Sequence, residues 1–439
     1  MPPPSKVFFN ELVGSELDAG EDKWRAAVAA LDGRIYCPPC CASRVLRIDP
    51  AATEAGGAAE PVGPDFGAEG GKWRAAALGA DGAVYCPPSG ASQVLRIDPA
   101  EGAAALIGPD FGMDQNKWRT VVVASDGCIY CLPLGASRVL RIDPGTGQVE
   151  LIGPDLRPGG EKYRAAVVGS DGCIYCPPCD ASRVLRIDPA AGSAELVGPD
   201  LGRCRAKWWT AVQGAGGELF CPPWRASQVL AINTTTANVE LIGPEFEGED
   251  CKWRAGARGG DGALYCPPSC AEQVLRIDPA SREVETIGRD LCYGGFKWSV
   301  AVPGHDGNVY CAPWQGSKVL RVDVAARAVD LLGPDFGPGG GKWRTAVEGE
   351  AGDFFLAPWC AVGVLRLGTA RGEVEVLKPT YGYGRDKWLP PLRMPDTGIF
   401  YSAPAGASQV LRVNFLDVGK KRPSREASRQ ASRHEGEPP

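Results

Sequence analysis

The sequence predicts an all-β fold, a single closed β-propeller of about nine four-stranded blades, each built from one repeat. The dipeptide Lys-Trp, once Lys-Tyr, opens nine units, and each unit contains four short strand-like segments. A period of this length indicates one supersecondary unit that is copied many times. The units begin, 49 residues apart at the first interval and 45 at the following seven, at Lys23, Lys72, Lys117, Lys162, Lys207, Lys252, Lys297, Lys342 and Lys387.

The third unit shows the expected order of the strands. Residues 117–124 are apolar and β-branched and predict the first strand, which a Ser-Asp-Gly turn joins to a second strand at 128–133. Residues 137–143 and 148–153 predict the third and fourth strands on either side of a Pro-Gly-Thr-Gly turn. No segment has the i, i+3, i+4, i+7 apolar spacing of a helix, which argues against a helical solenoid.

The turn between the first and second strands carries Asp-Gly in six units. This pair suits a two-residue type I′ turn, which needs positive φ at both central residues. We therefore expect type I′ hairpins at Asp32-Gly33, Asp81-Gly82, Asp126-Gly127, Asp171-Gly172, Asp261-Gly262 and Asp306-Gly307.

The two ends of the chain predict how the ring closes. Residues 6–17 match the fourth strands of the units, whereas the ninth unit, from Lys387, ends after three strands. The N-terminal segment should therefore complete the last blade and remove the open edges of the array. Because propellers typically have about four to eight blades, the alternative is eight blades with one displaced unit.

The propeller is expected to span residues 1–418. The remaining residues, 419–439, hold six Lys/Arg, three Glu and no apolar cluster, which is typical of a disordered basic tail.

The pattern KW…DGxIYCxP…ASxVLRIDPxxG…ELIGPD resembles a group of uncharacterised repeat proteins that share Lys-Trp, a Gly-x-Ile-Tyr strand, a proline and a Val-Leu-x-Ile-Asp strand. The match covers about residues 6–414. More distantly, the Ile-Asp-Pro and Gly turn is similar to NHL and YVTN-type propellers. The Gly-His…Trp-Asp pair of WD40 repeats and the double glycine of kelch repeats are both missing. The resemblance implies a propeller and no particular activity.

The Lys-Trp-Arg segment allows two interpretations. In the functional one, nine lysines and six arginines ring a channel and attract an anion; the arginines are Arg25, Arg74, Arg119, Arg164, Arg254 and Arg344. In the structural one, the lysine pairs with an acid seven residues upstream and the tryptophan packs between blades. The pairing is favoured because eight of the nine lysines have such an acid, namely Glu16, Asp65, Asp110, Asp155, Asp200, Glu245, Asp290 or Asp335.

Lys387 has Thr380 at that position instead of an acid. The residues to which we assign a recurrent structural role include Lys23, Trp24, Lys72, Trp73, Lys117, Trp118, Lys252 and Trp253.

The chain has 17 cysteines, and the position of the repeat that many of them share indicates a small, half-buried strand position. Seven share one position of the repeat, where the last two units have Leu356 and Ser402; they are Cys37, Cys86, Cys131, Cys176, Cys221, Cys266 and Cys311. Cys-x-x-Cys spacing recurs, but a zinc site usually needs two converging pairs, so we expect no metal and no other cofactor. The best metal candidate combines two blades: Cys37, Cys40 and Cys41 with Cys173, Cys176 and Cys179.

Histidine is scarce, since the chain has only His305 and His434. This argues against a His-activated serine or cysteine nucleophile. His305 is expected at an Asp-Gly turn, on the face opposite the proposed binding face. No catalytic residue is assigned.

The places that depart from the repeat are the candidate binding residues. The connections from fourth to first strand and from second to third strand should open on one face of a propeller, which we call the rim face. Trp224, Trp314 and Trp359 follow the rim-loop proline, where other units have smaller residues. Large aromatic side chains in a variable loop suit recognition. The candidate patch is Trp209, Trp224, Arg225, Trp314, Gln315 and Trp359, and local loop packing is the alternative.

We therefore expect a non-enzymatic scaffold that binds a protein or peptide on the rim face. A carbohydrate-binding, lectin-like propeller is the alternative, and an enzyme with a site in the central channel is a further one. The net charge of −6 argues against nucleic acid, and neither a membrane span nor a signal peptide is recognisable. We expect a cytoplasmic monomer, with nuclear import through the basic tail as a variant.

Overall fold

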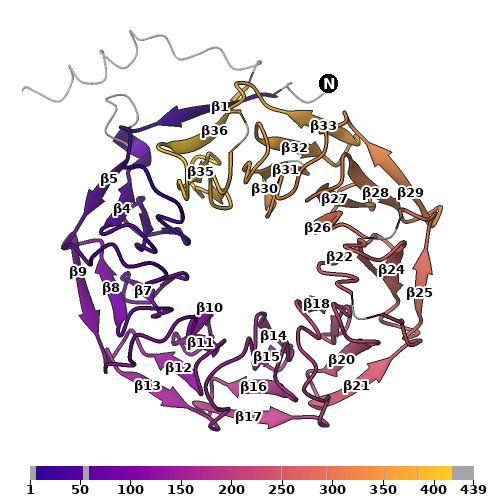
Figure 1. Cartoon of the computed structure of the whole chain (residues 1–439), viewed down its shortest axis with the longest axis horizontal. Helices are drawn as coiled ribbons and strands as arrows, with labels where there is room; N and C mark the ends of the chain where they lie inside the picture. Colours follow the sequence, from indigo (N-terminus) through magenta and orange to yellow (C-terminus); the bar gives the residue numbers. More distant parts are fainter. Residues whose placement is uncertain are drawn as a thin grey trace, which may run out of the picture.

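The computed structural model describes residues 6–52, 59–248, 250–292, 294–350, 352–382 and 384–417. These residues form nine four-stranded antiparallel sheets around a central channel (Figure 1). The prediction of nine blades is confirmed, and the eight-blade alternative is wrong. The expected disordered tail, residues 419–439, lies outside the described residues, as do residues 1–5.

In blades 1–8 the strands follow one another in chain order, and the first strand lies nearest the channel (Figure 1). The strands of blades 1–3 are β2 (Val28–Ala29), β3 (Ile35–Cys37), β4 (Val45–Ile48) and β5 (Ala59–Val62); β6 (Ala77–Leu78), β7 (Val84–Cys86), β8 (Val94–Asp98) and β9 (Ala103–Ile107); and β10 (Trp118–Val123), β11 (Ile129–Pro133), β12 (Val139–Ile142) and β13 (Val149–Ile152). A short 3-10 helix, η1 (Pro50–Ala52), follows β4.

The strands of blades 4–6 are β14 (Val167–Val168), β15 (Ile174–Cys176), β16 (Val184–Asp188) and β17 (Ser193–Val197); β18 (Val212–Gln213), β19 (Leu219–Cys221), β20 (Val229–Asn233) and β21 (Asn238–Ile242); and β22 (Ala257–Arg258), β23 (Leu264–Cys266), β24 (Val274–Ile277) and β25 (Val284–Ile287). Those of blades 7–9 are β26 (Trp298–Pro303), β27 (Val309–Pro313), β28 (Val319–Asp323) and β29 (Ala328–Leu332); β30 (Val347–Glu348), β31 (Asp353–Leu356), β32 (Leu365–Gly368) and β33 (Glu373–Val376); and β34 (Leu392–Arg393), β35 (Phe400–Ser402), β36 (Val410–Asp417) and β1 (Lys6–Val13). Within this part of the chain no helix is long and apolar enough to cross a membrane.

The first strand is long in only two blades. β10 and β26 have six residues each, whereas the other first strands have two and are preceded by an isolated bridge such as Trp24↔Pro39. β10 reads Trp-Arg-Thr-Val-Val-Val, in which the β-branched residues favour extended structure, and β26 contains Val300 and Val302.

The hairpin between first and second strands differs from the predicted type I′ turn. Gly33 has φ of 79°, but Asp32 is not among the described residues with positive φ, and the Gly33 amide donates to the Ala30 carbonyl at 3.1 Å. This is a type I turn followed by a left-handed glycine, the usual three-residue hairpin. Asp is needed for its carboxylate: Asp32 Oδ1 accepts from the Arg34 amide and Oδ2 from the Tyr36 hydroxyl.

The same Tyr–Asp hydrogen bond recurs in every Asp-Gly unit. The distance from hydroxyl to carboxylate is 2.8–3.0 Å for Tyr36, Tyr85, Tyr130, Tyr175, Tyr265 and Tyr310. Units five and eight lack the aspartate and have Phe220 and Phe355 in place of the tyrosine. Six of the seven tyrosines at this position thus have the turn aspartate as acceptor; the ninth unit has Thr397-Gly398 at the turn and keeps Tyr401 without that aspartate.

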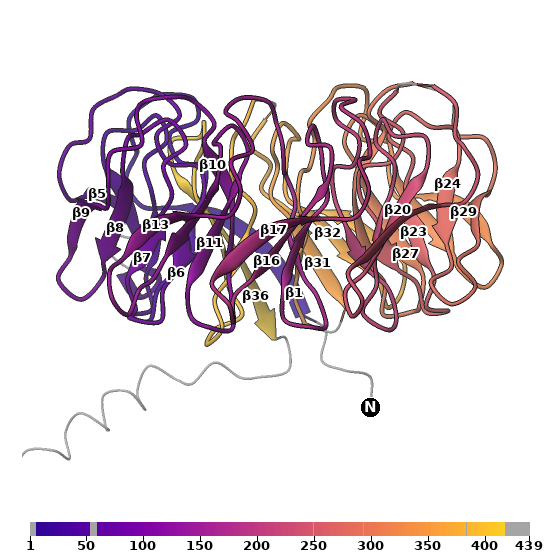
Figure 2. The same cartoon turned by 90° about the horizontal axis from the view of Figure 1, so that it is seen from below.

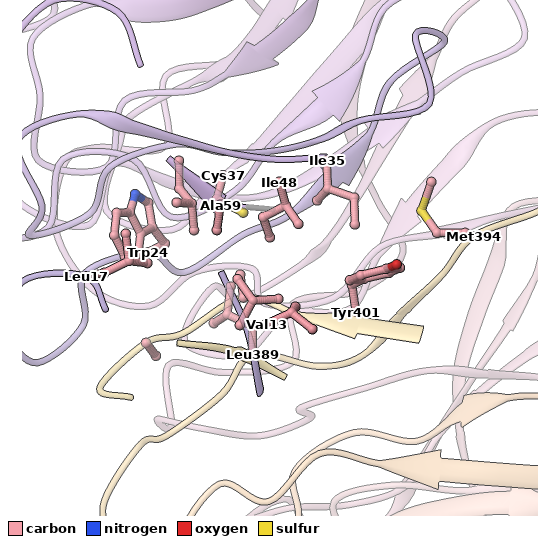
Figure 3. Close-up of a cluster of buried hydrophobic side chains, with 14 of the residues drawn as sticks. Val13, Leu17, Trp24, Ile35, Cys37, Ile48, Ala59, Leu389, Met394 and Tyr401 are labelled. Carbon is pink, nitrogen blue, oxygen red and sulfur yellow. The ribbon is translucent and has the colours of Figure 1, made fainter. Parts of the chain in front are cut away.

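The N-terminal strand closes the ring, as predicted. β1 pairs antiparallel with β36 over their whole length, and the Gln409 side chain donates to the Gly14 carbonyl at 2.8 Å. Figure 3 shows the buried side chains at this junction, where Trp24, Ile35 and Ile48 of blade 1 face Leu389 and Tyr401 of blade 9. Every sheet therefore has a neighbour on both sides.

Each repeat tryptophan packs between two blades. Trp73, which is 2% exposed, lies in one cluster with Tyr36 and Val45 of the preceding blade and Val84 of its own. Its indole nitrogen donates to the Gln93 carbonyl at 3.0 Å, and Phe66 contacts its ring edge-to-face at 5.2 Å. The other units repeat this arrangement, with Tyr163 donating through its hydroxyl. The predicted inter-blade packing is confirmed.

A closed ring of backbone hydrogen bonds runs around the channel on the rim face. In every unit the amide of the repeat lysine donates to the carbonyl of the residue that follows the rim-loop proline in the preceding blade. The carbonyl of the same lysine accepts from the amide of the residue that follows the rim-loop proline in its own blade. The series is continuous: Lys72 donates to Cys40, Ser89 to Lys72 and Lys117 to Ser89, until Lys23 donates to Ala405 at 3.0 Å. The 18 bonds measure 2.7–3.1 Å.

Replacing Trp253 by Ala should lower the free energy of unfolding by about 3–5 kcal/mol, because a buried aromatic side chain is removed from the blade junction. Trp253 is 2% exposed and contacts Phe246 at 4.8 Å. Urea unfolding followed by circular dichroism measures the effect. Leu31→Ala, at a side chain that is 79% exposed, is the control and should change little. Equal stabilities of the Trp253 variant and the native chain would contradict the packing role.

The Tyr–Asp hydrogen bond predicts coupling between two substitutions. Asp126→Ala leaves the hydroxyl of the fully buried Tyr130 without its acceptor, which should cost about 1–3 kcal/mol. The same substitution should cost less in a Tyr130→Phe background, where no hydroxyl is left. A double-mutant cycle of unfolding free energies measures the coupling, and strictly additive effects would show that the hydroxyl does not depend on Asp126.

Candidate functional site

The rim face lies where the sequence analysis placed it. The bridge between Trp24 and Pro39 joins the start of the first strand to the end of the second, so the connections that carry Lys-Trp and the rim-loop proline lie at the same end of each blade. The Asp-Gly turns, including the one beside His305, lie at the other end. Figure 2 shows the ring from the side, with long loops on its upper face and the end of β36 at its lower face.

The repeat lysines bind backbone carbonyls rather than the predicted acids. Lys72 Nζ donates to the carbonyls of Gly67 and Glu69 at 2.9 and 2.7 Å, and Lys207 Nζ reaches Ala181 in the preceding blade at 2.7 Å. Eight of the nine lysines are buried, and burial lowers their pKa, for Lys162 to about 8. The ammonium groups thus hold neighbouring rim loops together and are not exposed to a ligand.

The acid seven residues before the lysine caps its own loop. Asp65 Oδ1 accepts from the Gly67 amide at 2.8 Å, and Asp110, Asp155, Asp200, Asp290 and Asp335 accept from the amide two residues on in the same way. The predicted lysine–acid pairing was therefore wrong, because a compact turn brings the carboxylate to the nearest amide and leaves carbonyls for the lysine.

The six repeat arginines, in contrast, converge on the channel. Each follows Lys-Trp or Lys-Tyr; Arg119 lies within the innermost strand β10, and the other five lie just before the innermost strand of their blades. Arg119 in blade 3 interacts electrostatically with the like charges of Arg74 and Arg164 in the adjacent blades. It also interacts with Arg25 and Arg344, which lie farther round the ring. Burial and these like charges lower the pKa of Arg119 to about 10. Arg119 therefore lies close enough to the arginines of four other blades to interact with them electrostatically.

Trp209 occupies the arginine position of blade 5, where the segment reads Lys-Trp-Trp. Arg164 and Arg254, from the blades on either side, lie over its ring at 3.9 and 5.0 Å from the centroid. The Trp209 ring therefore lies between two guanidinium groups of like charge and forms a cation–π contact with each of them. The sequence contained this signal, since an alignment of the units puts Trp209 in the column of the arginines.

Trp314 and Trp359 extend the same arrangement. The Trp359 ring lies 4.9 Å from Arg344 and 5.2 Å from Arg25, and the Trp314 ring lies 6.0 Å from Arg254. Trp314 belongs to the unit that has Ser299 at the arginine position, and Trp359 belongs to the unit between those with Ser299 and Leu389 at this position. We call Arg25, Arg74, Arg119, Arg164, Arg254, Arg344 and the tryptophans Trp209, Trp314 and Trp359 the channel-mouth ring.

The candidate binding residues differ in how much surface they offer. Trp224 and Trp359 are each 5% exposed, Trp209 and Trp314 are half-buried, and Arg225 and Gln315 are exposed. Trp224 packs against Trp209 at 5.5 Å and stacks on Phe296 at 6.1 Å. The structure thus brings the tryptophans together around the channel and leaves Trp224 in the role of loop packing.

The rim face also carries grooves between neighbouring loops. One has a volume of about 810 Å³ and lies between the loop that leads into blade 8 and the loop that leads into blade 9, with Phe336, Val362 and Val376 among its lining residues. A second groove of about 620 Å³ lies at the equivalent place between blades 5 and 6 and includes Arg225. The grooves recur because each pair of blades repeats the same loops.

The two groups of cysteines in the metal candidate lie in different blade junctions and do not converge. Cys37 and Cys176 are fully buried in different blade junctions, and Cys173 Sγ accepts from Arg186 at 2.8 Å. Within the described part of the chain, no group of three His, Cys, Asp or Glu residues could hold a metal ion. His305 contacts Glu348 at 3.2 Å on the face opposite the rim.

Burial predicts which thiols react. We expect Cys204 and Cys292, which are exposed, to react first with a disulfide reagent such as DTNB, and Cys41, Cys251, Cys270 and Cys360, which are half-buried, to follow. The other eleven should react only on unfolding, since burial raises their pKa, for Cys266 to about 12. Time-resolved titration of the native protein measures this. Prompt reaction of all 17 thiols would contradict the arrangement of the blade junctions.

Comparisons with known proteins agree on the fold alone. No family model and no curated sequence matches the chain. Among solved structures, the propeller of Dos1 is similar over 92% of this chain and 95% of its own, with 8% identity and a TM-score of 0.51.

Virginiamycin B lyase from Staphylococcus aureus is similar over 67% of this chain and 94% of its own, with 14% identity and a TM-score of 0.47. An extracellular domain from B. thetaiotaomicron is similar over 90% of this chain and 52% of its own, with 10% identity and a TM-score of 0.42. Identities this low support the β-propeller fold and nothing beyond it. The resemblance to particular repeat families therefore stays a prediction.

Proposed function

We propose that this propeller is a non-enzymatic scaffold that binds a protein or peptide on its rim face. The observation that carries the proposal is the set of grooves between rim loops, which are open, partly apolar and repeated around the ring. Clefts of this kind, with an apolar floor and a few polar groups, are typical ligand sites. Their lining comes from the connections that vary most between units.

The groove between blades 8 and 9 is the best place for an extended segment. Its floor is formed by Phe336, Trp343, Val362 and Val376, and Lys378 and Arg385 lie at its edge. An apolar side chain of a ligand can fill the floor while the two cations bind an acidic neighbour.

To test the proposal, a peptide that binds the purified protein is first selected from a random peptide library. Val362→Asp places a charge in the groove and should weaken binding of the selected peptide by about tenfold or more, since burying an unpaired charge is costly. Leu31→Asp is the control, because Leu31 is exposed at a hairpin turn on the opposite face. The Leu31→Asp variant should bind the selected peptide as tightly as the native protein does.

Selection of no peptide, or equal affinities for both variants, would sink the assignment. A glycan array on the same protein tests the lectin-like alternative. Binding of a sugar that is lost in Trp314→Ser would favour that alternative, because half-exposed aromatic rings can stack on sugars.

A further inference from the structure

The channel-mouth ring carries more positive charge than its neighbours neutralise. Arg25 forms an ion pair with Asp22, and Arg164 Nε donates to Glu161 at 3.0 Å. Asp386 lies near Arg25 and Arg344, and burial raises its pKa. These three carboxylates face six arginines. Over the described residues, Arg74, Arg119, Arg254 and Arg344 have no carboxylate within ion-pair distance.

Donor groups at the mouth are also left without acceptors. The Nε atoms of Arg25 and Arg74 are buried and have no hydrogen-bond partner in the described structure. A guanidinium group is most stable when each N–H finds an oxygen, and an unpaired buried donor is costly. The protein thus holds desolvated cations and unfilled donors in one place.

We propose that the channel mouth binds an anion that carries several phosphoryl or carboxylate groups, held between Arg119, Arg254 and the arginines beside them. The planar guanidinium fork matches both kinds of oxyanion and binds them with two parallel hydrogen bonds. Since the six arginines come from six blades spread around the ring, a ligand with several charged groups meets more of them than a single small ion does.

The aromatic rings give this site its shape. Trp209 lies between Arg164 and Arg254, and Trp359 lies between Arg344 and Arg25. Each ring covers one side of two guanidinium groups. Of these four groups, Arg25 and Arg164 are paired with Asp22 and Glu161, whereas Arg254 and Arg344 form no ion pair with a described carboxylate and can offer their N–H edges to a ligand. Arg119 is half-buried and lies within electrostatic reach of Arg74 and Arg164 in the adjacent blades.

The electrostatics of the free protein agree with an unfilled anion site. Burial and the neighbouring arginines lower the pKa of Arg254, as of Arg119, to about 10. Both stay charged at neutral pH, so the repulsion persists until a counter-charge arrives. The site lies in the channel mouth and its ligand differs from a peptide in the outer grooves, so it goes beyond the proposed function.

Isothermal titration calorimetry at low ionic strength, with tripolyphosphate and with citrate as probes, tests the proposal. We expect the native protein to bind at least one of them, and the double variant Arg119→Gln/Arg254→Gln to bind it about 10- to 100-fold more weakly. Arg371→Gln is the matched control, because it also removes an arginine, one whose side chain is 70% exposed. Its affinity should equal that of the native protein.

The melting temperature gives a second, independent measure. Without a probe, Arg119→Gln should melt higher than the native protein, because a desolvated like charge is removed; with tripolyphosphate the order should reverse. Stronger binding of tripolyphosphate than of citrate identifies phosphoryl groups as the preferred source, and the opposite order identifies carboxylates. Absence of binding by both probes, or equal loss in Arg371→Gln and the double variant, would overturn the proposal. The groove variant Val362→Asp should bind the probes normally.

Discussion

The closed ring of lysine and rim-loop backbone hydrogen bonds is the constraint on which the rest of the structure depends. Each repeat lysine uses its amide to hold the preceding blade and its carbonyl to hold its own, and 18 such bonds return to the start at Lys23 and Ala405. In an open repeat array, each unit contacts only its neighbours and the ends are free. Here the N-terminal strand removes those ends, so the loss of one contact has consequences around the whole circle.

The ring also decides which side chains are free to act. The lysine side chain is directed to loop carbonyls, and the tryptophan that follows it enters the blade junction. The third residue of the segment therefore faces the channel, and the residue after the rim-loop proline has its backbone fixed but its side chain variable. Those two positions hold all of the channel-mouth ring, in which tryptophans stand beside arginines where units depart from the consensus. Structural demands thus fall on the lysine and tryptophan of each unit, and binding chemistry falls on the arginine position and on the residue after the rim-loop proline.

The sequence predicted the blade number, the strand order and the closure, because the period of the repeat and the missing fourth strand of the last unit are local, countable features. It predicted the packing of Trp73 and its equivalents because a large apolar residue in every unit must be buried. It failed for Lys72 and Asp65, since seven residues of separation do not reveal a turn that folds the carboxylate back onto the Gly67 amide. It failed for the Asp32 turn because type I and type I′ hairpins both accept Asp-Gly. From the sequence, convergence of the arginines on the channel was one of two interpretations of the Lys-Trp-Arg segment. The choice between the two depends on how the blades are arranged in space, which the sequence does not show.

Native-state hydrogen exchange at the amides of the nine repeat lysines tests the closed ring most directly. Since every one of these amides belongs to the same continuous series, they should all exchange slowly and with a similar free energy of opening, close to that of global unfolding. Deletion of β1 should then speed their exchange in all nine blades, including blades 4 and 5 across the channel. Exchange that stays slow there and rises only next to the deleted strand would show that the blades are held by their neighbours alone.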